Sequence, residues 1–377
     1  RFIKVGTENI HIIPTSEWLG IDAKPIIIAG PCSAESEAQI LQEAEILANT
    51  GKVHLMRAGI WKPRTRPNTF EGMGAKALPW LRKAQEQFGI KWMVEVANEE
   101  HVKLALDSGI EVVWVGARTT VNPFSVQEIA NALEGKDIPV FVKNPLNPDL
   151  ELWIGAIERF SKAGLNKLVA IHRGFNTYQD HVFRNSPNWE IPIELKTKLP
   201  QLDIIVDPSH IAGKRDLLHE VSQKVLDLAF DGLMIEVHPN PDDALSDPKQ
   251  QIALSNFDGF LNELENRKTH FVDAVSIDKL QRLRSLIDEI DYNLLENLKR
   301  RIDIVEEIGH YKAESGVTVF QLDRWIEIIE DRLKYAQDQG LDQSLIKEMW
   351  TLIHNASIKR QTEIVNKNLS ERDTFDA

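Results

Sequence analysis

Short apolar runs recur along the first two thirds of the chain, and polar segments with helical spacing separate them. Eight such runs occur, PIIIAG (25–30), VHLMRAG (53–59), KWMVEV (91–96), EVVWVGA (111–117), PVFVKN (139–144), KLVAIHRG (167–174), DIIVDPSH (203–210) and GLMIEVH (232–238). Runs rich in Val and Ile that are apolar at consecutive positions are typical of parallel strands buried on both faces. Eight strand-then-helix units over about 230 residues predict a closed (β/α)8 TIM barrel. Residues 1–24 would be a short N-terminal extension, with a hairpin as its candidate structure.

After about residue 265 the apolar positions change to steps of three and four. They run from Ile277 through Leu280, Leu283, Leu286, Ile290, Leu294, Leu298 and Ile302 to Val305, which predicts one long amphipathic helix. Gly316 and Gly340 separate two further predicted helices, at about 318–338 and 342–367. We therefore expect a barrel domain at 1–265, a linker at 266–275 and an all-α domain at 276–377.

Composition and charge narrow the classes of function. The 377-residue chain carries a net charge of −13, which argues against a nucleic-acid or anionic-membrane partner. No apolar run reaches the roughly 20 residues that span a bilayer, and the first residues lack the apolar core of a signal peptide. The single cysteine excludes an intramolecular disulfide, so we expect a cytoplasmic protein.

Cationic residues stand at or just after the ends of several predicted strands. They are Arg57, Lys62, Arg64, Arg118, Lys143 and Arg173. The C-terminal ends of the strands form the active-site rim of a TIM barrel, so these side chains are expected to converge there. Arg and Lys bind phosphate and carboxylate groups. The pattern predicts substrates with two phosphates, or with a phosphate and a carboxylate.

A second set at the same rim has the chemistry of metal ligands. It consists of Cys32, His210, Glu236 and Asp247, from strands that closure of the barrel would make neighbours. One sulfur, one nitrogen and two carboxylate ligands suit Mn, Fe, Co or Zn better than Mg or Ca. Taken alone, Cys32 would be a small buried core residue, and only its three partners favour the metal. The tryptophans Trp61, Trp92, Trp114 and Trp153 are interpreted as packing residues.

The motifs AGPCSAES, RAGIWKPRT, GARTTVNP, VKNP, IHRGF, DPSH and EVHPNPDDALSDPKQ occur in this order over residues 25–251. Together they resemble the 3-deoxy-D-arabino-heptulosonate 7-phosphate (DAHP) synthases of the short bacterial type. The resemblance implies a condensation of phosphoenolpyruvate with erythrose 4-phosphate, the first step of the shikimate pathway. It also implies a divalent cofactor, with Mn favoured, on Cys32, His210, Glu236 and Asp247.

The resemblance also assigns roles to the cations. Phosphoenolpyruvate would be bound by Arg57, Lys62, Arg118, Lys143 and Arg173, and erythrose 4-phosphate by Arg64 and Thr65. Lys62 would give a proton to the new alkoxide, while the metal polarises the aldehyde. Arg66 departs from the small residue that many relatives carry there, and the KPRT loop argues against the related octulosonate-phosphate synthases.

The segments LRSLIDEID, NLKRRIDIVEEIGHYK, QLDRW and KRQ resemble the all-helical chorismate mutases. The resemblance implies that Arg301, Lys312, Arg324 and Gln361 bind chorismate, and that Arg284 comes from the other subunit of a homodimer. Arg301, Lys312 and Gln361 would be catalytic in its rearrangement to prephenate. Gln321 and Trp325 stand where the family commonly has carboxylates.

Helix geometry bears on this assignment independently. Arg301 and Lys312 are separated by about 1100° of helical turn and so share nearly one face, whereas Arg284 points roughly 100° away from Arg301. The structural alternative is a solvated charged helix face.

Two functional hypotheses follow for the helical domain. The first is a bifunctional enzyme in which chorismate or prephenate, bound by the helices, inhibits the barrel. The second keeps the synthase and makes the helical domain a dimerising ligand sensor. A barrel that acts on another sugar phosphate is a third possibility.

Overall fold

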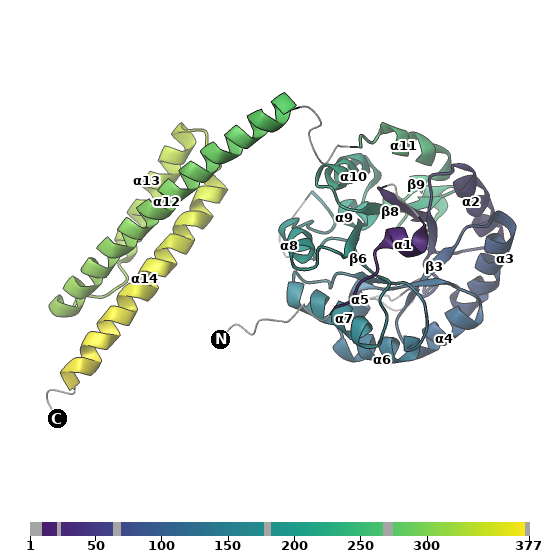
Figure 1. The fold of residues 1–377 in the computed structure, drawn as a ribbon, viewed down its shortest axis with the longest axis horizontal. Coiled ribbons are helices and arrows are strands. Elements are labelled where there is room, and N and C mark those ends of the chain that lie inside the picture. Colours follow the sequence, from purple (N-terminus) through teal and green to yellow (C-terminus); the bar gives the residue numbers. More distant parts are fainter. Residues whose placement is uncertain (1–9, 21–23, 63–68, 177–181, 267–273, 374–377) are drawn as a thin grey trace. The chain divides into compact units, whose positions relative to one another are not determined.

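The computed structural model describes residues 10–20, 24–62, 69–176, 182–266 and 274–373, with only the backbone given at 274–275 and 368–373. The chain divides into two compact units, Arg1–Thr269 and His270–Ala377. The first unit is a ring of strands surrounded by helices, and the second consists of helices (Figure 1).

Eight parallel strands close the ring of the first unit. Their bounds are β1 Ile26–Gly30, β2 Leu55–Ala58, β3 Trp92–Val96, β4 Val112–Val115, β5 Val140–Lys143, β6 Leu168–His172, β7 Asp203–Val206 and β8 Gly232–His238. Each strand pairs in parallel with the next, and β1 pairs with β8 so that Gly30 lies opposite Glu236. This confirms the predicted TIM barrel. A further two-residue strand, β9 (Ile252–Ala253), pairs with the end of β8 and was not predicted.

Helices and short 3-10 turns connect the strands. The α-helices are α2 Glu37–Asn49, α3 Leu78–Phe88, α4 Glu99–Asp107, α5 Ala117–Thr120, α6 Pro123–Leu133, α7 Leu150–Lys162, α8 Glu190–Lys198, α9 Pro208–Ala212, α10 Leu218–Asp227 and α11 Phe257–Glu263. The 3-10 turns are η2 Gly74–Ala77, η3 Arg215–Leu217, η4 Pro241–Asp243, η5 Pro248–Gln250 and η6 Leu254–Asn256. Side-chain caps begin several helices, for example Asn98 on α4 and Asp149 on α7.

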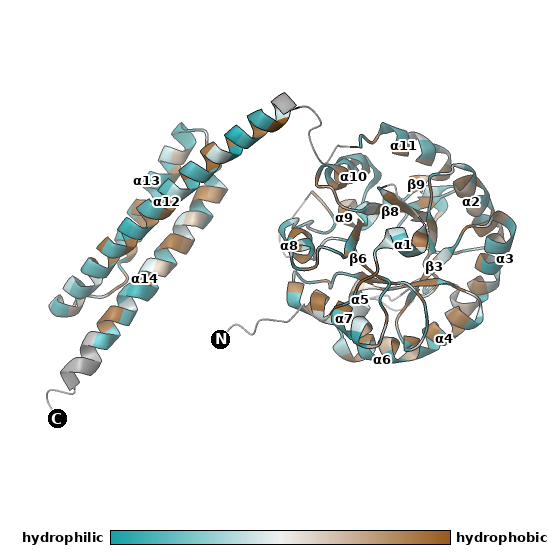
Figure 2. Cartoon of the chain, viewed as in Figure 1, coloured by the Kyte–Doolittle hydropathy of each residue, from teal (hydrophilic) through white to brown (hydrophobic). Residues whose placement is uncertain are grey.

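The barrel has an inner and an outer apolar core. Alternate residues of each strand point inward, and Ile26, Leu55, Met93 and Phe141 are among those that fill the interior. The residues between them pack against the surrounding helices. Hydrophobic colour accordingly marks the strands and the sides of the helices that face them (Figure 2).

A short helix, α1 (Thr15–Leu19), precedes the barrel and packs against its interior. Trp18 and Leu19 contact the inner core, and the Trp18 ring meets the Phe141 ring edge-on with centroids 6.3 Å apart. The described part of the N-terminal extension therefore forms a helix and not the suggested hairpin. The helix places Trp18 and Leu19 against the apolar interior of the barrel. Residues 1–9 lie outside the described residues.

Three helices form the second unit: α12 Ala274–Ser315, α13 Leu322–Asp338 and α14 Gln343–Asp373. Both α12 and α13 pack against α14. At Gly309 the two long helices approach so closely that a Cβ atom there would lie 3.4 Å from the Cα of Gln361. Many apolar side chains of this unit remain exposed, including Leu286 and Ile290 on α12.

Candidate active sites

Charged residues continue the inward-facing rows of the barrel strands. Arg57 stands two positions after the interior residue Leu55, and Glu236 stands two positions after Met234. Because side chains two residues apart on a strand share a face, both charges point into the barrel above its apolar core. Lys143 on β5 is placed in the same way, after Phe141. All three of these charged side chains are buried.

These charges form one ion-pair network. The Nη1 atom of Arg57 lies 3.2 Å from Oε1 of Glu236 and 4.0 Å from Oδ2 of Asp207. The Nζ atom of Lys143 lies 2.8 Å from the same Asp207 oxygen. Burial raises the pKa of Asp207, but His210 and Lys143 outweigh it and hold that pKa well below its usual range. The positive charges of Arg57 and Lys143, two of the six predicted rim cations, are therefore partly neutralised by buried carboxylates.

Trp114 contributes to this network as well as to packing. The Arg57 guanidinium lies 5.1 Å from the centre of the Trp114 ring, within range of a cation–π interaction. The indole Nε1 donates a hydrogen bond of 3.1 Å to Oε2 of Glu95, the inward-facing charge of β3. A Cβ at Gly116 would lie 2.0 Å from Oε1 of Glu95, so a larger residue there would displace the Glu95 carboxylate from this position. Interpreting Trp114 as a packing residue alone was incomplete, whereas Trp92 and Trp153 are buried in the outer core.

The four predicted metal ligands lie in two neighbouring pairs. The Sγ atom of Cys32 is 3.5 Å from Oδ2 of Asp247, and Nδ1 of His210 is 3.9 Å from Oε1 of Glu236. The same His210 nitrogen is 2.8 Å from Oδ2 of Asp207. Within the described residues, no three His, Cys, Asp or Glu side chains already form a group that could hold a metal ion.

Cys32 is buried at the end of β1 beside Lys62. Its Sγ atom lies 3.2 Å from the Lys62 Nζ, which also donates a hydrogen bond to the Cys32 carbonyl oxygen. Burial, followed by the nearby Glu236 charge, raises the pKa of the Cys32 thiol to about 12. Without a further cation the thiol is therefore protonated, and a bound metal would favour the thiolate.

Two residues that the sequence did not single out connect the predicted ligands. Arg184 donates from Nη1 to Oδ1 of Asp247 over 3.0 Å and to Oε1 of Gln250 over 2.6 Å. Gln250 in turn donates a hydrogen bond of 2.6 Å to Oε2 of Glu236. Burial raises the Asp247 pKa, but Arg184 and His210 lower it to about 2. No periodic pattern surrounds Arg184, so only the fold brings it to Asp247.

The remaining cations of the barrel differ in exposure. Arg173 is buried, and its Nη1 donates to Oδ1 of Asn185 over 2.8 Å, while burial lowers its pKa to about 10. Arg118, on α5, is exposed. Arg64 and Thr65, predicted to bind the aldose phosphate, lie outside the described residues.

In the helical unit, three of the five residues predicted to bind chorismate are buried or half-buried. Arg301 on α12 donates from Nη1 to the Oγ of Ser357 on α14 over 2.6 Å. Lys312 donates to the carbonyl oxygen of Val319 over 2.7 Å, and both cations are half-buried. Gln361 is buried, and its Oε1 has no hydrogen-bond partner among the described residues.

The other two predicted residues are exposed. Arg324 forms an ion pair of 2.5 Å with Glu327, on the same helix, and Arg284 also faces outward. Ser357 was not predicted from the sequence, and neither was His354, whose ring stacks on Trp325 with centroids 4.0 Å apart. Their spacing of three along α14 could have indicated a shared face.

Comparison with known proteins identifies both units. Residues 4–272 match the model of the DAHP synthetase I family. The chain belongs to that family. Residues 283–362 match the chorismate mutase type II model. The two matches confirm the predicted enzyme classes, a DAHP synthase domain followed by a chorismate mutase domain.

Individual relatives agree with this assignment. A phospho-2-dehydro-3-deoxyheptonate aldolase from Thermotoga maritima is 31% identical over 239 residues, which are 63% of this chain and 68% of the relative. A 4-amino-4-deoxychorismate mutase from Streptomyces venezuelae is 39% identical over 77 residues, 20% of this chain and 74% of the relative. The crystal structure of a DAHP synthase from Thermotoga maritima superposes with a TM-score of 0.58 at 27% identity, covering 68% of this chain and 75% of that one. No described helix combines the length and the apolar character needed to cross a membrane.

Proposed function

We propose that the chain is a bifunctional shikimate-pathway enzyme. The barrel condenses phosphoenolpyruvate with erythrose 4-phosphate to DAHP and phosphate, and the helical unit rearranges chorismate to prephenate. The observation that carries the first activity is the buried network of Arg57, Lys143, Asp207 and Glu236 above the barrel core. Such a network holds cations in fixed positions for the two anionic substrates.

In the condensation, carbon 3 of phosphoenolpyruvate bonds to the aldehyde carbon, water adds at carbon 2, and phosphate leaves. Phosphoenolpyruvate is held by Arg57, Lys62, Arg118, Lys143 and Arg173, and erythrose 4-phosphate by Arg64 and Thr65. Lys62 gives its proton to the oxygen that was the aldehyde. Its half-buried position and its contacts with Cys32 support this role, because they fix the ammonium at the rim.

We also propose that Cys32, His210, Glu236 and Asp247 hold a divalent metal, with Mn favoured. The donor set fits such an ion, and Oε1 of Glu236 is buried beside Arg57 and His210 but forms no well-aligned hydrogen bond among the described residues. When bound, the cation would supply Lewis-acid polarisation of the aldehyde oxygen. Arg184 and Gln250 keep Asp247 and Glu236 oriented through the hydrogen bonds described above.

The rearrangement of chorismate needs no nucleophile, since it is pericyclic. It needs cations for two carboxylates and hydrogen-bond donors for charge that grows on the ether oxygen. Arg301 and Lys312, both half-buried, and the buried Gln361 have this chemistry, and Arg324 would add a cation. The amide NH2 of Gln361 is the group that could donate to the ether oxygen, because its Oε1 can only accept.

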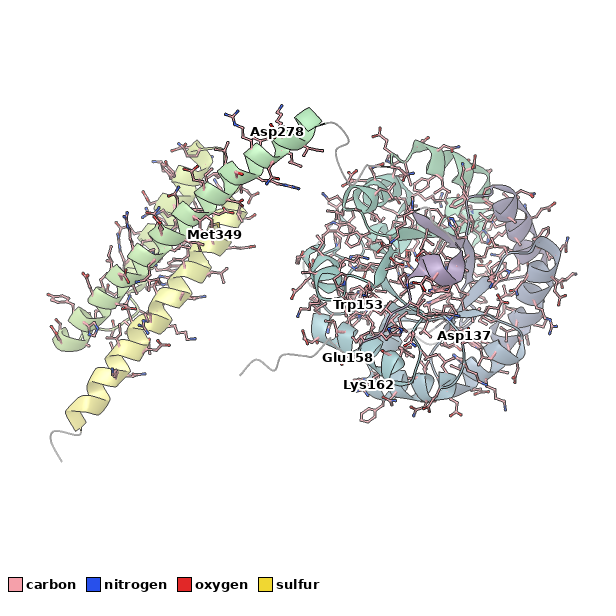
Figure 3. All side chains as sticks on the ribbon, viewed as in Figure 1. Asp137, Trp153, Glu158, Lys162, Asp278 and Met349 are labelled. Atoms are coloured by element: carbon pink, nitrogen blue, oxygen red, sulfur yellow. The ribbon has the colours of Figure 1, made fainter. Side chains whose placement is uncertain are left out.

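We further propose that the helical unit forms a homodimer and that Arg284 serves the site of the other subunit. Exposed apolar side chains on all three helices support this, because a stable monomer rarely leaves so many uncovered. Met349 on α14, labelled in Figure 3, belongs to this exposed set. Chorismate or prephenate at the helices would inhibit the barrel and so limit entry into the pathway.

The alternative is a helical unit that senses ligand with little catalysis. Gln321 and Trp325, which replace carboxylates common in the family, favour it. A two-substrate assay distinguishes these possibilities, with phosphoenolpyruvate and erythrose 4-phosphate in one arm and chorismate in the other, each with and without prephenate. Offering arabinose 5-phosphate in place of erythrose 4-phosphate tests the third possibility. Both activities, with prephenate slowing the first, support the proposal; chorismate binding without turnover supports the sensor.

A further inference from the structure

His354, on α14, contacts two aromatic rings of the second unit. Its ring stacks on Trp325 of α13 at 4.0 Å and 21°, and it meets the Phe320 ring edge-on at 6.0 Å. It lies three residues before Ser357 and seven before Gln361, so all three share one face of α14. That face carries the groups proposed to bind chorismate.

Some polar groups on this face of α14 already have hydrogen-bond partners, and others have none among the described residues. Ser357 accepts a hydrogen bond from Arg301 and donates one of 2.7 Å to the carbonyl oxygen of Ile353. The Nε2 atom of His354 is buried and finds no partner among the described residues, and the same is true of Oε1 of Gln361. A buried polar atom without a partner is costly, and a ligand that supplies one removes that cost.

The charges near His354 restrict what that ligand group can be. Burial lowers the pKa of His354, and Arg301 and Lys312 lower it further, so the ring is neutral near pH 7. A neutral imidazole can donate or accept, which matches a hydroxyl. A cationic group placed there would be repelled by Arg301 and Lys312 and would find no countercharge on the imidazole.

Chorismate has two carboxylates, an ether oxygen and one ring hydroxyl. The cations suit the carboxylates, and Lys312 and Gln361 suit the ether oxygen, which leaves the hydroxyl for His354. We propose that Nε2 of His354 binds the ring hydroxyl of chorismate and makes the helical site select this substrate over its 4-amino analogue. This rests on the proposed mutase function. It also separates this site from that of the Streptomyces relative, which is named for the amino compound.

The test measures kcat/KM of the full chain for chorismate and for 4-amino-4-deoxychorismate. The variant His354→Phe keeps an aromatic ring against Trp325 and removes the nitrogen, and His354→Asn restores a polar group. Asn355→Ala, at the adjacent exposed position on α14, is the matched control. Circular dichroism verifies that each variant keeps its helical content.

We expect the wild type and Asn355→Ala to prefer chorismate by at least about tenfold, because the amino analogue brings a cation beside two others. His354→Phe should lose about tenfold in kcat/KM for chorismate, the loss of one hydrogen bond, but little for the amine. His354→Asn should recover part of the preference.

An unchanged preference in His354→Phe would overturn the inference and leave the mutase function standing. Equal losses on both substrates would also overturn it, because they would show a structural role. If the wild type converts neither compound, the proposed mutase function fails, and the inference fails with it.

Discussion

The Nζ atom of Lys62 lies 3.2 Å from the Sγ atom of Cys32 and also donates to the Cys32 carbonyl oxygen. The residue proposed to deliver a proton and the one proposed to bind a metal are thus neighbours. Any change to one alters the electrostatics of the other, so their roles must be separated by measurements other than activity.

Replacing the thiol tests the proposed metal site. Cys32→Ala removes the sulfur ligand, so we expect at least about tenfold weaker metal retention and a comparable loss of condensation activity. Metal content after dialysis against a chelator, measured by mass spectrometry, provides the readout independent of activity. Ser33→Ala, at the next buried position, is the control and should retain the metal. Full metal content in Cys32→Ala would contradict the assignment.

Replacing Arg57 should lower the unfolding free energy of the barrel much more than replacing Lys62. Arg57→Met leaves the buried Glu236 without its ion-pair partner, so we expect a loss of about 3–5 kcal/mol from the unfolding free energy of the barrel, together with lost activity. Lys62→Met removes a half-buried side chain at the rim and should lose activity with a change of less than about 1 kcal/mol. Thermal unfolding and the condensation assay measure the two effects. Equal destabilisation by both variants would contradict this reading of the network.

The acid stability of the barrel should depend on Asp203, at the start of β7. Burial raises its pKa, but hydrogen bonds from Lys24 and Thr15 outweigh burial and lower it to about 2. A depressed folded-state pKa stabilises the fold above the unfolded value of about 3.9, and this contribution is lost as pH falls through about 2. Asp203→Asn should therefore cost about 1–3 kcal/mol at pH 7.

The gap in stability between the wild type and Asp203→Asn should narrow as the pH falls from 4 to 2. Unfolding by denaturant at each pH measures it. Asp137, labelled in Figure 3, is 85% exposed and pairs with Lys167, so Asp137→Asn is the control, with an effect below about 1 kcal/mol. A gap that stays constant over this pH range would show that the Asp203 charge contributes no stability.

The exposed apolar face of α12 should be an interface between subunits. Leu286→Glu and Ile290→Glu place charges among exposed apolar side chains, so we expect dissociation to monomers and a large loss of chorismate conversion. Sedimentation velocity measures the first effect. Ile46→Glu, at an exposed apolar position on α2 of the barrel, is the control and should not change the mass. A wild-type monomer at assay concentration would refute the dimer.

Much of the fold was predictable because buried positions recur along the sequence with the period of a strand or a helix. The eight Val- and Ile-rich runs mark the strands, and a charge two residues after an interior residue, as in Leu55 and Arg57, predicts a rim side chain. By contrast, β9 has two residues and α1 has five, too short for any period to be recognised. The helical packing of α1 depends on Trp18 meeting Phe141 across the barrel end, a contact over more than a hundred positions.

The sequence predicted which residues belong to the candidate sites, but it did not predict which of their side chains contact one another. Nothing in the sequence near Arg57 shows that its charge meets Glu236, because that contact depends on the register of β1 with β2 and β8. Likewise, the link from Arg184 through Gln250 to Glu236 joins a loop to β8. Trp114 was recognised as buried, but its hydrogen bond to Glu95 requires the neighbouring strand. Long-range partners of this kind appear only once the chain has folded.

The most direct test of the central claim is a crossed pair of variants assayed for both reactions. Lys143→Ala should abolish DAHP formation from phosphoenolpyruvate and erythrose 4-phosphate and leave chorismate conversion within about threefold of the wild type, because its contacts lie in the barrel. Arg301→Ala should do the reverse, since it contacts Ser357 within the helical unit. Loss of only the matching activity in each variant is the predicted result. Chorismate conversion that is absent from the wild type, or unaffected by Arg301→Ala, would contradict the account.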